Sequence, residues 1–125
     1  MKRVMRRDEI TMSKFEETNL MPHQIQALEV IRRNLLELFP VEAIFLYGSA
    51  ARGEADPESD IDLLILTSRE LSRFERHQIT HLVFDVNLEH DTNFSTLVVD
   101  RFSWETGLFS VLPIHYQILE DGILV

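Results

Sequence analysis

Apolar positions along this chain alternate between the 3.6-residue period of a helix and the short continuous runs of a buried strand. The first helical stretch begins near Pro22, a residue suited to a first helical turn, and ends before Pro40. A second helix is predicted over residues 69–84. The apolar residues expected to face the core from these two helices are Ile25, Leu28, Ile31, Leu35, Leu36 and Phe39, then Leu71, Phe74, Ile79, Leu82, Val83 and Val86.

Three short apolar runs predict strands at residues 43–47, 60–66 and 94–99. The run at 60–66 is apolar on both faces after its first residues, which is typical of a central strand covered on both sides. The remaining elements are a short helix with Ser103 as its N-cap, a helix starting at Pro113 and an edge strand at 123–125. This order predicts an α/β (α+β) fold, in which helices flank a small mixed β-sheet.

Length and charge limit the classes of protein that fit. The chain has 125 residues, which predicts one domain over 21–125 after a segment of mixed charge at 1–20. Its net charge is −9, so a broad duplex nucleic-acid surface is not expected. It contains no cysteine, which excludes disulfides, and no apolar run of membrane-spanning length. We therefore expect a soluble cytoplasmic protein that does not bind a membrane.

Two short polar motifs lie at the ends of the first two predicted strands. Gly48 and Ser49 follow the first strand, and they are expected to turn into a short helix whose free backbone N–H groups suit phosphate. Asp60 and Asp62 open the second strand, and their spacing places both carboxylates on the same side of it. Two neighbouring carboxylates repel each other unless a cation lies between them, and Mg²⁺ is the cation that such oxygen ligands favour. The motifs together predict a site for a metal–phosphate ligand.

These residues carry a family resemblance. The pair Gly48-Ser49, ten intervening residues and then Asp60-x-Asp62 resembles the signature of the nucleotidyltransferase superfamily that includes DNA polymerase β. The fuller strings Leu46–Gly53 and Ser59–Leu63 resemble the minimal nucleotidyltransferases of bacteria and archaea. The resemblance implies a polymerase β-like core, with nucleotide bound at Gly48 and Ser49 and with Asp60 and Asp62 as catalytic ligands of Mg²⁺.

The family resemblance also implies a third carboxylate at the start of the third strand, which this sequence does not supply there. Counting back from Trp104 places that position at Ser95, and serine is neither a base nor a strong Mg²⁺ ligand. Asp91 precedes the strand and is the candidate to reach the site in its place. The alternative is that Asp91, like Asp85, Glu89 and Asp100, is a surface acid.

Two further groups of residues have two interpretations each. Arg52 is a candidate for binding phosphate oxygens, or for pairing with an acid of the following loop and so holding the turn. His77, His81 and Asp85 have a spacing that could bind zinc, but nothing nearby completes a tetrahedral site and the pattern arises often by chance.

The resemblance implies transfer of a nucleoside monophosphate, AMP being favoured, from Mg-NTP to an acceptor hydroxyl. Proteins of this kind resemble the antitoxin half of a module with an all-helical HEPN ribonuclease toxin, so a HEPN-domain protein is the implied acceptor. The alternative is a weakly active or inactive nucleotide-binding module that neutralises a protein partner by binding it. A homo-oligomer is a further possibility, for which the candidate interface residues are Phe109, Val111, Leu112 and Ile123.

Overall fold

The structure is a computed structural model that describes residues 18–56 and 58–125, so the predicted segment 1–20 lies almost wholly outside the described residues. Its elements are α2 (Pro22–Leu38), β1 (Val41–Tyr47), β2 (Ile61–Thr67), α3 (Arg73–His90), β3 (Phe94–Asp100), α4 (Arg101–Glu105), the 3-10 helix η1 (Leu108–Val111), α5 (Pro113–Asp121) and β4 (Ile123–Leu124). Every strand predicted from the sequence is present, with ends that differ by no more than two residues from those expected.

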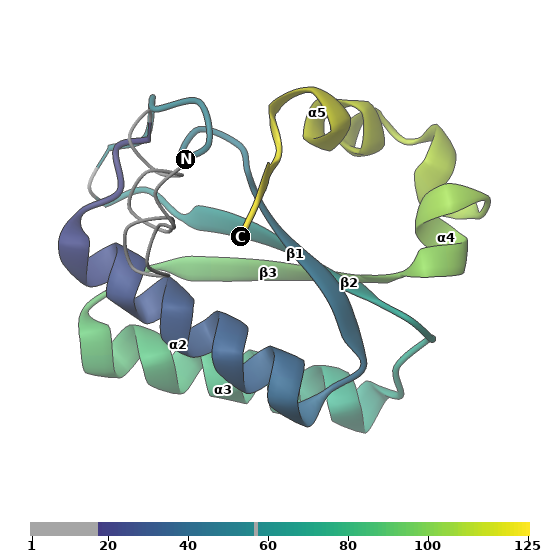
Figure 1. Cartoon of the computed structure of the whole chain (residues 1–125), viewed down its shortest axis with the longest axis horizontal. Helices are drawn as coiled ribbons and strands as arrows, with labels where there is room; N and C mark the ends of the chain where they lie inside the picture. The colour runs from purple at the N-terminus through teal and green to yellow at the C-terminus, as the bar shows by residue number, and fades with distance from the viewer. Residues whose placement is uncertain (1–17, 57) are drawn as a thin grey trace, which may run out of the picture.

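The four strands form one mixed sheet in the order β3-β2-β1-β4. Strand β1 is antiparallel to both of its neighbours, β2 and β4, whereas β2 and β3 are parallel. Helices α2 and α3 cover one face, and α4 and α5 lie on the other side of the sheet (Figure 1). The predicted α+β class, the mixed sheet and the terminal edge strand are therefore confirmed.

The alternation of side chains along β2 divides the core into two layers. Ile61, Leu63 and Ile65 pack under α2 and α3, in a cluster that includes most of the apolar stripe of α2. Leu64 packs on the opposite face with Trp104 and the C-terminal helices. A strand that is buried on both faces reads as a continuous apolar run, which is why its central position was predictable.

Helix α3 differs most from its prediction. It begins at Arg73, because Ser72 caps it: the Ser72 hydroxyl accepts a hydrogen bond from the Glu75 N–H, and the Glu75 carboxylate accepts one from the Ser72 N–H. It continues to His90 and ends at Asp91, whose left-handed backbone has a φ of 54°. The expectation that Phe74 faces the core was wrong, because its side chain is 71% exposed.

Two local predictions were also wrong. The N-cap of α4 is Asp100, not Ser103: the Asp100 carboxylate accepts hydrogen bonds from the N–H and the hydroxyl of Ser103. Residues 48–53 form successive turns and no helix, although the Arg52 N–H bonds the Gly48 carbonyl as a helical turn would. No helix among the described residues is long and apolar enough to cross a membrane.

Candidate functional site

Three polar side chains lie in a row across one end of the sheet. Tyr47 on β1 is opposite Asp62 on β2, and Asp62 is opposite Ser95 on β3. Neighbours in register direct their side chains to the same face. That face is the one covered by α4 and α5, because the next positions on it, Leu64 and Leu97, pack with those helices. The row therefore lies where the layer of C-terminal helices meets the end of the sheet.

Asp60 completes an acidic pair with Asp62, as the spacing predicted. Asp60 is exposed one residue before β2, whereas Asp62 is half-buried in the strand. Burial raises the pKa of Asp62, and the negative charge of Asp60 raises it further. The pKa of Tyr47 is likewise raised by burial and by the charge of Asp62. This end of the sheet therefore holds negative charge that a bound cation would stabilise.

Gly48 brings the backbone against this carboxylate pair. Its φ is +76°, which side chains with a Cβ rarely adopt. A Cβ placed on Gly48 would lie 2.8 Å from Asp62 Oδ2. Glycine is therefore required at position 48 for two reasons: the conformation of the turn and the close approach to Asp62.

The turn after Gly48 offers several hydrogen-bond donors. Within the described part of the chain, no hydrogen bond takes up the backbone N–H groups of Ser49, Ala50 or Ala51. The turn is closed instead by bonds further on, including one from the Glu54 N–H to the Ser49 carbonyl at 2.9 Å. Successive unpaired N–H groups beside a left-handed residue form a concave anion site, so phosphate can bind here although the predicted helix is absent.

In this structure Arg52 pairs with acidic residues, which is the second of the two roles considered from the sequence. Its Nε lies 3.1 Å from Glu54 Oε2, and its Nη1 lies 3.8 Å from Asp121 Oδ2 at the end of α5. These pairs tie the turn to the C-terminal helix. The Arg52 side chain remains 41% exposed, so it is accessible to a ligand that would compete with the two acids.

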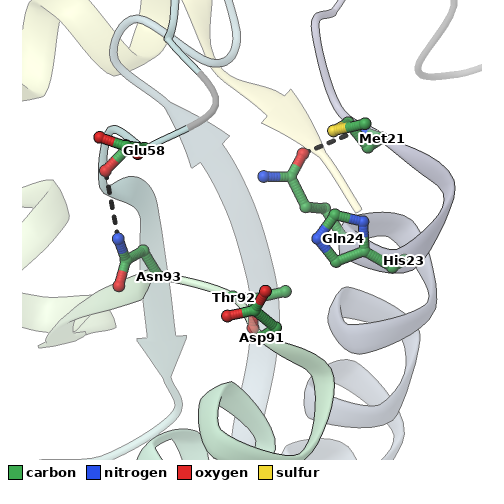
Figure 2. A pocket seen from close by; sticks show the side chains of 7 residues that line it. All are labelled: Met21, His23, Gln24, Glu58, Asp91, Thr92 and Asn93. Carbon is green, nitrogen blue, oxygen red and sulfur yellow. Dashed lines mark hydrogen bonds between the residues drawn. The ribbon is translucent and has the colours of Figure 1, made fainter.

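Asp91 is the C-cap of α3 and lies shortly before β3 in the chain. It lines a cavity of about 550 Å³ with His23 and Gln24 of α2, Glu58 and the neighbouring Thr92, together with Met21 and Asn93 (Figure 2). Asp60 and Asp62 do not line this cavity. Among the described residues, no three histidine or acidic side chains are arranged to hold a metal ion. The geometry therefore gives no support to Asp91 as the third carboxylate.

Ser95 occupies the position that the count from Trp104 assigned to a third ligand. It is exposed, lies in register with Asp62 and lines a second cavity, of about 370 Å³, together with Asp60. The walls of that cavity come from α3 and β3, and the other lining residues are Thr80, Val83, Phe84, Asn87, Phe94 and Thr96. This second cavity, unlike the one around Asp91, is lined by one member of the acidic pair, Asp60.

Sequence reasoning missed two residues of the site. Tyr47 belongs to the motif, but only the register shows that its phenol lies beside Asp62. Asp121 comes from the far end of the chain, and no local pattern links it to Arg52. The proposed zinc residues His77, His81 and Asp85 are exposed on α3.

Comparison with known proteins identifies the family. The sequence profile described as "Nucleotidyltransferase domain" matches residues 28–119, which include the Gly48 turn, the acidic pair and Ser95. The chain belongs to the nucleotidyltransferase domain family. Members of this family generally use a divalent metal ion, and the donors present here fit one: Asp62 faces a turn where only glycine leaves room, and the Asp60 carboxylate lies close enough to raise the pKa of Asp62.

Two relatives extend the similarity to adenylyltransferases. The chain is 35% identical over 69 residues to a spectinomycin 9-adenylyltransferase from Campylobacter jejuni, covering 55% of this chain and 26% of that protein. It is 33% identical over 61 residues to a Methanocaldococcus jannaschii protein provisionally named a protein adenylyltransferase, covering 49% of this chain and 62% of that one. The chain thus spans less than two thirds of either relative.

A solved structure confirms the fold. A chain from a toxin–antitoxin complex crystallised with AMP-PNP has a TM-score of 0.53 and 19% identity, over 83% of this chain and 72% of that one. At this level of identity the likeness concerns the fold, and the fold is that of a nucleotidyltransferase core. The two sequence relatives and this structural neighbour agree with the family assignment.

Proposed function

We propose that this nucleotidyltransferase transfers AMP from Mg-ATP to a hydroxyl group of another molecule. The observation that carries the proposal is the close approach of Asp62 to the Gly48 turn, with the charge of Asp60 acting on the same carboxylate. The carboxylates would hold Mg²⁺, and the unpaired N–H groups after Gly48 would receive the β- and γ-phosphates. The similarity to two adenylyltransferases supports AMP as the transferred group.

The proposed transfer needs no oxidant and no cofactor other than Mg²⁺. The acceptor oxygen attacks the α-phosphorus, the bond from the α-phosphorus to the bridging oxygen breaks, and pyrophosphate leaves with Mg²⁺. The proton of the acceptor hydroxyl passes to solvent. Because the transition state of such transfers is loose, positioning and charge neutralisation contribute more than a strong base. The chain's own part is to align the α-phosphate between the acidic pair and the turn.

The proposed acceptor is a protein of the HEPN class, modified on a tyrosine hydroxyl. Structural support comes from a neighbour whose crystal is a toxin–antitoxin complex containing AMP-PNP. An acidic chain with net charge −9 is suited to a basic protein partner. ATP and such a partner would both be available in the cytoplasm, where we place the protein.

The test is incubation with labelled ATP, Mg²⁺ and a purified HEPN-class protein, taken from the same genome where one is encoded there. Label should appear covalently on that protein with the wild type, but not with the Asp60→Asn, Asp62→Asn variant. Absence of label with a folded wild-type protein that binds Mg-ATP would contradict transfer to this partner.

A second candidate function is a binding module with weak or no transferase activity. Ser95 favours it, because the residue opposite Asp62 on β3 is not a carboxylate. The same incubation separates the two candidates. A module of the second kind would bind Mg-ATP and the partner without labelling it.

A further inference from the structure

We propose that this site binds a single divalent ion, the one that arrives with the triphosphate, because Ser95 takes the place from which β3 would supply ligands for a second. The inference rests on the proposed function and goes beyond it, since it states how many ions the site can hold and which residue sets that number.

Asp62 lies on β2, between the neighbouring strands β1 and β3. In the sheet, Asp62 has one register neighbour on each side, Tyr47 on β1 and Ser95 on β3. Both present an uncharged oxygen, a phenol on one side and an alcohol on the other. Mg²⁺ and Mn²⁺ strongly favour carboxylate oxygens over neutral hydroxyls. Neither neighbouring strand therefore adds a strong ligand to the acidic pair.

The other acidic residues near this end of the sheet do not line the cavity that Asp60 and Ser95 share. Asp91 and Glu58 line the cavity of about 550 Å³ beside α2 (Figure 2), not the cavity of about 370 Å³ that Asp60 and Ser95 share. Asp100 lies at the opposite end of β3, where its carboxylate caps α4. Across the described residues, no set of three acidic or histidine side chains is placed to hold an ion.

The number of carboxylates in a site limits the number of divalent ions that it can bind. Mg²⁺ is commonly bound by one or two protein carboxylates together with substrate phosphates, which matches Asp60, Asp62 and a triphosphate. In two-metal sites the ions lie about 3.5–4 Å apart, so the second ion needs ligands that offset its repulsion from the first. Ser95 is exposed and neutral, so β3 supplies no negative charge opposite Asp62 to offset that repulsion.

The test measures how many divalent ions each chain binds together with the nucleotide. Full-length wild-type protein and AMP-PNP are mixed in equal amounts, well above their dissociation constant, and Mn²⁺ is added while electron paramagnetic resonance reports the free ion. Calorimetry on the same sample shows that the nucleotide is protein-bound. We expect saturation at one Mn²⁺ per chain. Saturation at two would overturn the inference while leaving the proposed nucleotide site in place.

Two variants identify the residue responsible. Ser95→Asp should raise the count from one Mn²⁺ to two, because it adds a carboxylate opposite Asp62. Ser68→Asp is the matched control: it adds the same charge at an exposed serine just beyond the end of β2 that is remote from Asp62, and should remain at one. If Ser95→Asp folds and also remains at one, Ser95 does not set the number of ions and the inference fails. If either variant does not fold, the wild-type count still decides the inference.

A different result would contradict the proposed function. Replacing Asp60 and Asp62 by asparagine should remove Mn²⁺-dependent AMP-PNP binding. If that variant bound the metal nucleotide as tightly as wild type, the site itself would be wrong, whatever number of ions the wild type held.

Discussion

Gly48 lies so close to Asp62 that a Cβ on Gly48 would be 2.8 Å from the Asp62 carboxylate oxygen Oδ2. The two residues belong to different strand ends, β1 and β2, which are paired antiparallel. This contact joins the phosphate half of the site to the metal half. A metal ion bound to Asp62 would therefore be within reach of phosphates that rest on the Gly48 turn.

The first prediction concerns Gly48→Ala. An L-residue in the left-handed region costs about 1–2 kcal/mol, and here the methyl group would also displace the Asp62 carboxylate. Gly53→Ala is the matched control, because Gly53 has a similar φ of 72°. Both variants should lose similar stability in thermal unfolding. Only Gly48→Ala should lose Mg-ATP affinity by about tenfold or more, which corresponds to about 1.4 kcal/mol. Equal affinity losses would contradict the role of the contact.

The second prediction concerns the pH dependence of the apo protein. The folded state raises the pKa of Asp62 above its ordinary value of 3.8, through burial and through Asp60. The stability contributed by protonated Asp62 is therefore fully present below about pH 3.8 and is lost as the pH rises through the raised value. Asp62→Asn should unfold at a higher temperature than wild type at pH 7, and the difference should shrink towards pH 4. Saturating Mg-ATP should reverse the order at pH 7, because only the wild type binds it.

The strands and the acidic pair were predictable because their signals are local. Pro40 and Gly48 bound β1 in the sequence, and the spacing of Asp60 and Asp62 predicts neighbouring carboxylates, in agreement with the effect of Asp60 on the pKa of Asp62. The count back from Trp104 pointed to Ser95, which lies opposite Asp62 in the sheet. The surroundings of Asp91 could not be predicted from the sequence, because they depend on where α3 ends: Asp91 is its left-handed C-cap and lines the cavity beside α2.

The remaining differences come from competition between residues of similar propensity. Asp100 and Ser103 are both good N-cap residues, and only the end of β3 decides that Asp100 takes the position. The turn after Gly48 has the composition of a helix start, but its N–H groups remain unpaired. The Arg52–Asp121 pair depends on tertiary packing between distant parts of the chain and has no local signal.

The third prediction tests the capping box of α3. Ser72→Ala removes the acceptor for the Glu75 N–H and should reduce the free energy of unfolding by about 1 kcal/mol. Ser68→Ala replaces an exposed serine of the preceding loop and should have little effect. Denaturant unfolding measures both. Equal and small losses would show that the box does not determine where α3 begins.

The fourth prediction concerns the acid of the same capping box. The hydrogen bond from Arg69, with help from the Ser72 N–H, lowers the pKa of Glu75 to about 2. Its contribution to stability is therefore present above its ordinary value of 4.5 and is lost as the pH falls towards 2. Glu75→Gln should be less stable than wild type at pH 7, and the two should converge in acid. A difference that persisted at pH 2 would point to packing, not charge.

The last prediction separates the two roles of Arg52. Its pairs with Glu54 and Asp121 are largely exposed, and such pairs contribute about 0–1 kcal/mol, whereas hydrogen bonds to a charged group contribute about 1.5–3 kcal/mol. Bound triphosphate should therefore displace the two acids from Arg52. We expect Arg52→Gln to weaken Mg-ATP binding by about tenfold, which is about 1.4 kcal/mol. Asp121→Asn should leave binding unchanged or slightly tighter, because it removes a competitor for the guanidinium group. Calorimetry on both variants decides: if neither changes the affinity while both lower the unfolding temperature, Arg52 only holds the turn.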